Sequence, residues 1–217
     1  MNDFEEKWKK SQIAGWINDK EEVVLFFKRF GIEFDDIYNR ILLLKYEQLR
    51  TVCFLLSKIR KIIDICDFLD QKAKLCKWDV DVMKIYLLIS HAEIAMRDFG
   101  GRDENKKLVE NFFNPVVKES KLNYKIRLSL GGFPMDNKRS LIGTQILYKM
   151  RCEYVHEGNY TGKIFRSEYD EDFSFNIFTF KCDRLEILCG ECNFTYEQFL
   201  VVYIRALMEN IKLYIKK

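Results

Sequence analysis

The feature that most constrains the fold of this chain is a long run of apolar residues at helical spacing without a helix breaker. Between about residues 35 and 69, apolar side chains recur every three or four residues, as they do along one face of an α-helix. The chain has only two prolines, Pro115 and Pro134, and both lie outside the run. Helices beyond about 25 residues are typical of coiled coils or repeats, and neither a heptad nor a repeat is evident, so we expect a break inside the run.

Other segments show the same helical spacing. Thr195 and Gln198 form a capping-box pair that predicts the start of a final helix reaching about Ile215. We interpret the ambiguous segment Lys121 to Leu130 as helix. The remaining helices are predicted over residues 3–17, from Asp19 to Gly31, from Asp79 to Gly100, and over 104–120, where Pro115 must kink or divide the helix.

One segment before the last helix has a different period. Phe173, Phe175, Ile177 and Thr179 alternate with their neighbours, which predicts a strand, and Leu185 to Leu188 supplies a partner. The sequence therefore predicts an all-α fold, a helical bundle with a small β-hairpin before the last helix. We expect an N-terminal helical layer over 1–76 and a helical domain over 77–217. No linker marks a boundary, so the alternative that both form one domain stays open.

Composition excludes several classes of protein. Of 217 residues, 48% are hydrophobic, which is enough for a packed core. A net charge of +3 is too balanced to indicate a general nucleic-acid binder, so any basic surface must be local. We expect no membrane span, because no run approaches about 18 uncharged apolar residues. The acidic N-terminus lacks a signal-peptide core, and seven scattered cysteines suit a reduced, cytoplasmic protein.

The candidate catalytic residues are Arg151 and His156, on a predicted helix that ends at Gly158. Ile142, Ile146, Met150 and Tyr154 recur every four residues and give this helix a buried face. Histidine titrates nearest to neutral pH, and arginine presents a planar fork to phosphate oxygens. The pair is therefore suited to phosphodiester chemistry. The alternative is a surface arginine and a histidine that caps the helix.

This pattern of Arg, four residues, His and then Gly at the end of an apolar helix resembles the motif of the HEPN superfamily. The segment Tyr86 to Gly101 is similar to the glutamate-bearing helix that precedes the motif helix in several branches. The resemblance covers about residues 80 to 215. It implies a metal-independent endoribonuclease of a prokaryotic defence or toxin system, with RNA as substrate and no cofactor. It also implies a homodimer whose two motif helices form one composite site, and a possible antitoxin or defence-system partner protein.

The resemblance assigns supporting positions to three further residues. Glu93 is expected to fix Arg151 or His156 if its helix packs against the motif helix. The alternative is a local pair with Arg97, one turn later. Cys152 and Glu153 directly follow the arginine. Active HEPN members usually carry a polar residue, often Asn or Asp, where this chain has Cys152, and a thiol is a weaker hydrogen-bonding group than an amide.

Candidate RNA-binding residues flank the motif helix. Lys138 and Arg139 precede it, and Tyr160 follows it and is suited to base stacking. A second basic segment contains Lys58, Arg60 and Lys61 with Lys72, Lys74 and Lys77. A solvated helix face is the more common explanation for such a segment.

No metal site is expected. Cys189 and Cys192 with nearby Cys182 supply too few ligands for structural zinc, which needs four. His91 is interpreted as structural, and Cys53 and Cys66 as core residues.

Two other functions remain open. One is a catalytically silent HEPN-like module that binds nucleotide, RNA or protein, which Cys152 and the near-neutral charge favour. The other is a structural helical adaptor.

Overall fold

The computed structural model describes Lys7 and residues 15–76, 80–130, 143–156, 160–161, 164–165, 175–181 and 184–216. The described chain is mainly helical, as expected of an all-α protein. Its helices are η1 (Gly15–Asn18), α2 (Lys20–Lys28), α3 (Asp35–Leu42), α4 (Tyr46–Cys76), α5 (Asp81–Asp98), α6 (Asn105–Phe113), α7 (Leu122–Lys125), α8 (Gly143–His156) and α9 (Tyr196–Tyr214).

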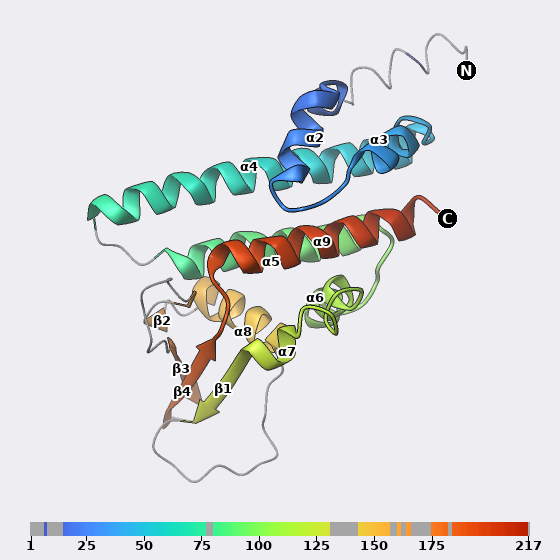
Figure 1. The fold of residues 1–217 in the computed structure, drawn as a ribbon. Helices are drawn as coiled ribbons and strands as arrows, with labels where there is room; N and C mark the ends of the chain where they lie inside the picture. Colours follow the sequence, from blue (N-terminus) through green and yellow to red (C-terminus); the bar gives the residue numbers. More distant parts are fainter. Residues whose placement is uncertain are drawn as a thin grey trace.

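The helices stack in layers around α5 (Figure 1). The short helices α2 and α3 lie against the long helix α4, and α4 runs antiparallel to α5. Helix α9 lies beside α5, while α6 and α8 pack against the other side of α5. The buried apolar residues form one continuous cluster that extends from Ile17 to Ile211. Helix α5 is therefore in contact with both the N-terminal and the C-terminal parts of the bundle.

The expected break in the long apolar run lies at residues 43–45, between α3 and α4. Leu43 caps α3 and is 83% exposed, whereas Ile41 and Leu44 on either side are buried. The break lets both helices turn their apolar faces to the same core. Helix α4 alone then continues for 31 residues.

Several helix ends follow the local signals. Asp19 accepts a hydrogen bond from the backbone of Glu22, and Thr195 and Gln198 form the predicted capping box. Gly100 has φ of +92° just after α5, a conformation that L side chains rarely adopt. Helix α6 ends at Phe113, before Pro115, so of the two outcomes expected at the proline the structure has the interruption of the helix and not the kink.

A four-stranded antiparallel sheet covers one end of the bundle, in the order β1-β4-β3-β2. Its strands are β1 (Ile126–Leu130), β2 (Tyr160–Thr161), β3 (Phe175–Lys181) and β4 (Arg184–Cys192). Strands β3 and β4 pair at the place where the alternating segment predicts a hairpin, with Ile177 opposite Leu188.

The helix prediction for Lys121 to Leu130 is wrong in its second half. Helix α7 ends at Lys125, and Ile126–Leu130 forms β1, paired with the far end of β4. In this segment apolar residues alternate with Arg127 and Ser129, which is the two-residue period of a strand. Five residues are too few for this period to stand out beside the helical pattern of the neighbouring segments. Pairing with β4 decides the conformation.

None of the described helices is long and apolar enough to cross a membrane.

Candidate functional site

Helix α8 carries the candidate catalytic arginine and is held closely by the bundle. Ile146, Leu147 and Met150 are buried and face the core. Gly143 is the first residue of α8 and lies very close to α7: a Cβ atom at this position would be 2.7 Å from the carbonyl oxygen of Leu122. A side chain at this position would push the helix away, so the glycine permits the close approach of α8. Arg151 directly follows buried Met150.

Arg151 forms an ion pair with Glu93 of α5. Its Nη2 donates a hydrogen bond to Glu93 Oε2 at 3.2 Å, and its Nε lies 3.1 Å from Oε1. The Nε–Oε1 contact is ionic and lacks the geometry of a hydrogen bond, since both atoms are buried without a hydrogen-bond partner. The Glu93 side chain is 8% exposed and that of Arg151 is 19% exposed. The arginine therefore has one edge against a buried carboxylate and retains some contact with solvent.

Burial raises the pKa of Glu93, and the positive charges of Arg151 and Arg97 oppose this shift. Arg97 donates a hydrogen bond to Asn105. The sequence leaves two partners open for Glu93, a residue of the motif helix or Arg97 on its own helix. In the structure Glu93 pairs with Arg151 of α8, and Arg97 bonds to Asn105 instead.

Tyr148 and Cys152 lie next to this ion pair on α8. Burial, a hydrogen bond with Cys152 and the nearby Glu93 carboxylate raise the pKa of Tyr148 to about 12. Cys152 is a half-buried free thiol. Cys152 thus interacts with a neutral tyrosine hydroxyl.

The other predicted site residues are placed only in part. Glu153 and His156 belong to the last turn of α8, and Tyr160 to β2, but their side chains lie outside the described part of the structure. Lys138 and Arg139 also lie outside the described residues. The structure brings together Glu93, Tyr148, Arg151 and Cys152.

A second ionic cluster surrounds Lys84, near the start of α5, and was not predicted from the sequence. Lys84 Nζ lies 2.5 Å from Asp70 Oδ1, 3.3 Å from Asp81 Oδ1 and 4.1 Å from the centre of the Tyr196 ring. Asp81 Oδ2 also accepts hydrogen bonds from the backbone N–H groups of Ile164 and Phe165, at 2.9 and 3.0 Å. The cluster joins α4, α5, α9 and the 164–165 segment. The feature of the sequence that could have indicated this cluster is Lys84 itself, a lysine on a helix face that is otherwise apolar.

His91, between these two sites on α5, lies in the core. Its Nε2 lies 3.2 Å from the carbonyl oxygen of Leu55, to which it can donate, its Nδ1 lies 2.7 Å from the Tyr203 hydroxyl, and that hydroxyl oxygen lies 2.9 Å from the carbonyl oxygen of Leu88. Burial lowers the pKa of His91 to about 4, so the ring is neutral at pH 7. These contacts tie α4, α5 and α9 together and confirm the structural interpretation.

Metal ligands do not gather in the part of the chain that the structure describes: it contains no group of three or more His, Cys, Asp or Glu residues suited to a metal ion. Cys53 and Cys66 are buried among apolar side chains, as expected of core residues, and burial raises both thiol pKa values.

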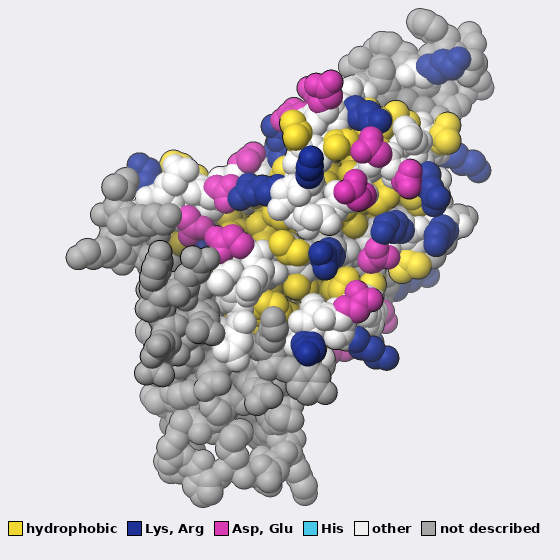
Figure 2. Space-filling model, in the orientation of Figure 1, with side chains coloured by type: hydrophobic (Ala, Val, Ile, Leu, Met, Phe, Trp, Pro, Cys, Tyr) yellow, Lys and Arg dark blue, Asp and Glu magenta, His cyan; other side chains and the backbone are white. Residues whose placement is uncertain are grey.

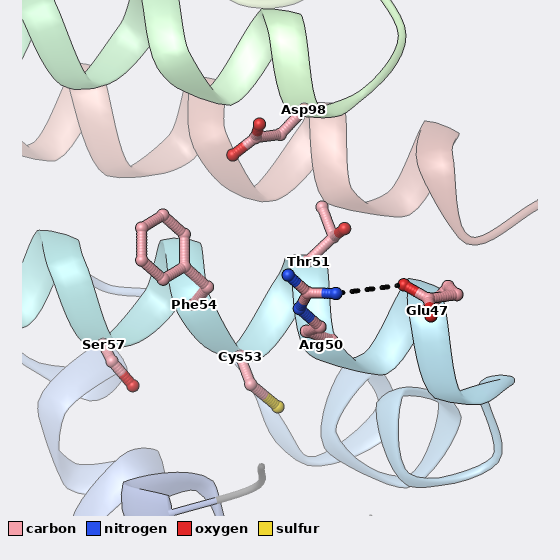
Figure 3. Close-up of a pocket in the computed structure, with 7 residues that line it drawn as sticks. All are labelled: Glu47, Arg50, Thr51, Cys53, Phe54, Ser57 and Asp98. Atoms are coloured by element: carbon pink, nitrogen blue, oxygen red, sulfur yellow. Dashed lines mark ion pairs between the residues drawn. The ribbon is translucent and has the colours of Figure 1, made fainter.

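The surface has an open hollow of about 580 Å³ away from Arg151, between the start of α4 and the end of α5. Figure 3 shows Thr51 and Phe54 projecting from α4 toward the side on which Asp98 lies, and Arg50 paired with Glu47. The Arg50 charge is already matched by Glu47, so the hollow offers no concentrated positive charge for a phosphate.

Charged groups of both signs are interspersed over the face shown in Figure 2, with apolar patches between them. This agrees with the near-neutral net charge of the sequence.

Comparisons of the chain with protein-family models, with curated proteins and with solved structures give no match.

Proposed function

We propose that the protein is a metal-independent endoribonuclease of a prokaryotic defence or toxin system, of the kind that the HEPN resemblance implies. The observation that carries the proposal is the ion pair between Glu93 of α5 and Arg151 of α8. It fixes an arginine on the helix whose last residue is His156. Such a pair of residues matches the chemistry that RNA cleavage requires.

The arginine has hydrogen-bonding capacity left for a phosphate. Glu93 contacts its Nε and Nη2 atoms, and a guanidinium carries five N–H donors in a planar fork. The Nη1 side of the fork is then available to stabilise negative charge on a phosphorane. A buried carboxylate that holds the opposite edge reduces the conformational freedom lost when RNA binds.

His156 is assigned the proton-transfer role. In this mechanism the imidazole accepts the proton of the RNA 2′-OH, whose oxygen attacks the adjacent phosphorus. The P–O5′ bond breaks, the leaving oxygen takes up a proton from water, and the imidazolium of His156 then returns its proton to water. The products carry a 2′,3′-cyclic phosphate and a 5′-OH.

A homodimer belongs to the same proposal. Two copies of α8 across a two-fold axis supply two Arg151 and two His156 side chains around one groove. This doubles the local positive charge of a nearly neutral chain, which helps it to hold a polyanion. Light scattering tests the assembly, and a stable monomer contradicts the composite site.

The activity test uses purified protein, total RNA and a chelator. Cleavage is expected for the wild type and is expected to be lost in Arg151→Ala and in His156→Ala. Exposed Lys107→Ala serves as a matched control that removes a cation elsewhere. The 5′-OH ends are identified because polynucleotide kinase labels them without prior phosphatase treatment. Strict dependence on added Mg²⁺, or 5′-phosphate products, contradicts this mechanism.

The second candidate function is a catalytically silent module that binds nucleotide, RNA or a partner protein. The pairing of Cys152 with Tyr148 favours it, because a thiol next to a neutral hydroxyl is a poor substitute for a polar residue that orients substrate. The same assay separates the two functions: RNA that is bound but stays intact supports the module.

A further inference from the structure

Opposite its buried face, α4 carries a row of exposed and half-buried side chains, which we call the α4 ridge and which begins beside the hollow that Phe54 lines with Asp98 of α5. Its apolar members Phe54, Ile65 and Phe68 are 53%, 47% and 55% exposed. Lysines occupy the intervening positions, so the ridge consists of Phe54, Lys58, Lys61, Ile65, Phe68 and Lys72. The steps between successive members are four, three, four, three and four residues, and the ridge spans about 27 Å of helix. This spacing is that of the contact positions of a coiled coil.

The ridge is also positively charged. Lys58 Nζ lies 5.3 Å from the centre of the Phe54 ring, and Lys72 Nζ lies 5.5 Å from that of Phe68. Among the described residues, no ion pair within 4 Å involves Lys58, Lys61 or Lys72. Lys20, Lys84, Lys107 and Lys212, by contrast, each pair with a carboxylate. Cation–π contacts hold Lys58 and Lys72 near the aromatic rings without neutralising their charge. Lys58 is also near Asp98 of α5: burial raises the pKa of this carboxyl group, and the Lys58 charge opposes the shift.

We propose that the α4 ridge is the docking surface for an acidic amphipathic helix of a partner protein. Apolar residues of that helix, at spacing of three and four, pack against Phe54, Ile65 and Phe68. Its flanking Asp and Glu side chains pair with the three lysines. Such a helix supplies both the apolar cover and the negative charge that the ridge lacks.

A second copy of this chain fits the ridge less well than an acidic helix. Each copy contributes three lysines and no carboxylate from the ridge itself, so self-pairing places like charges along one seam. Charge complementarity therefore favours a different protein.

RNA is also disfavoured as the occupant. Strand-binding proteins expose aromatic ring faces in a groove for base stacking. Here lysines lie over two of the rings, and all the side chains of the ridge come from a single helix.

The test uses a fluorescently labelled synthetic helix of three heptads with Leu at a and d and Glu at e and g. The glutamates keep the free peptide from pairing with itself. Fluorescence anisotropy is expected to show binding to the full-length protein. The double variant Phe54→Ala/Phe68→Ala is expected to weaken it at least about tenfold, as truncation of aromatic anchors does in other interfaces. The matched control Leu25→Ala/Leu43→Ala removes exposed apolar side chains from α2 and from the end of α3, and is expected to leave binding unchanged.

A charge exchange makes the test specific. The triple variant Lys58→Glu/Lys61→Glu/Lys72→Glu is expected to lose the glutamate peptide and to bind one with Lys at e and g. Circular dichroism verifies that each variant is folded. No binding of the glutamate peptide, or equal binding by the charge-reversed variant, overturns the proposal. Loss of U-rich single-stranded RNA binding in the Phe54→Ala/Phe68→Ala variant, without peptide binding, assigns the ridge to RNA. A dimer that this variant abolishes assigns it to self-association.

Discussion

Helix α5 has a buried charged side chain toward each end, and the two side chains differ in the number of charged groups that contact them. At the first end, Lys84 contacts two carboxylates and an aromatic ring, and its side chain is 4% exposed. Near the second end, Glu93 contacts one arginine, and its two carboxylate oxygens receive one hydrogen bond in all from that arginine. Burial raises the pKa of Glu93, which means that the charged carboxylate is held at a cost to stability.

The difference distinguishes a cluster suited to stabilising the fold from the candidate functional site. A charge with more than one opposite partner offsets its own desolvation and ties elements together. A charge that is held with an incomplete set of partners keeps capacity for a further ligand, and residues of this kind gather at functional sites. We therefore expect substitutions at the Lys84 end to affect mainly stability, and substitutions at the Glu93 end to affect mainly activity.

The largest expected effect is that of Lys84→Ala. Removing the ammonium leaves Asp70 and Asp81 close together without their cation, a loss that typically costs about 3–5 kcal/mol. Urea unfolding measures the change, with Lys107→Ala, which breaks an exposed i,i+3 pair, as the control that should stay within about 0.5 kcal/mol. A loss no larger than that of the control contradicts the stabilising role of Lys84.

His91, between the two ends, predicts a pH dependence of stability. The folded pKa of about 4 lies below the ordinary value of 6.5, so the unfolded chain binds more protons between these limits. Stability is therefore lost as pH falls from about 6.5 toward 4, by up to about 3 kcal/mol. Unfolding curves at successive pH values measure this slope. In a His91→Gln variant the slope over this range should be smaller than in the wild type.

Asp81→Asn should produce an intermediate effect, confined largely to one segment. The carboxylate accepts two backbone N–H groups and faces Lys84, and loss of its charge is expected to cost about 1–3 kcal/mol. Hydrogen exchange is expected to show faster exchange of the amide protons of Ile164 and Phe165. Unchanged exchange at both amides would mean that Asp81 does not hold this segment.

Glu93→Gln is expected to change stability least. Because burial penalises the carboxylate, an amide of the same shape should leave the free energy of unfolding within about 1 kcal/mol of wild type or raise it. RNA cleavage should nevertheless fall, because a neutral amide orients Arg151 less firmly. A large loss of stability in this variant removes the contrast between the two ends of α5.

The sequence by itself determined the helices and several of their ends. Apolar spacing, two prolines and local caps such as Thr195 with Gln198 act within one or two turns, so they can be read without knowledge of the fold. The Arg151 and His156 motif and its glutamate helix were also found in this way, although the catalytic role assigned to them remains a prediction.

The tertiary structure decided which distant groups meet. Glu93 had two possible arginines, and the packing of α5 against α8 brought it to Arg151, 58 residues away, rather than leaving it to pair with Arg97 one turn along its own helix. Ile126–Leu130 became a strand because β4 offers it backbone hydrogen-bond partners, which five residues cannot specify alone. Lys84 was buried because Asp70 and Asp81 meet it there. Local periodicity fixes which face of an element is apolar, but only packing fixes which polar group on another element satisfies a buried charge.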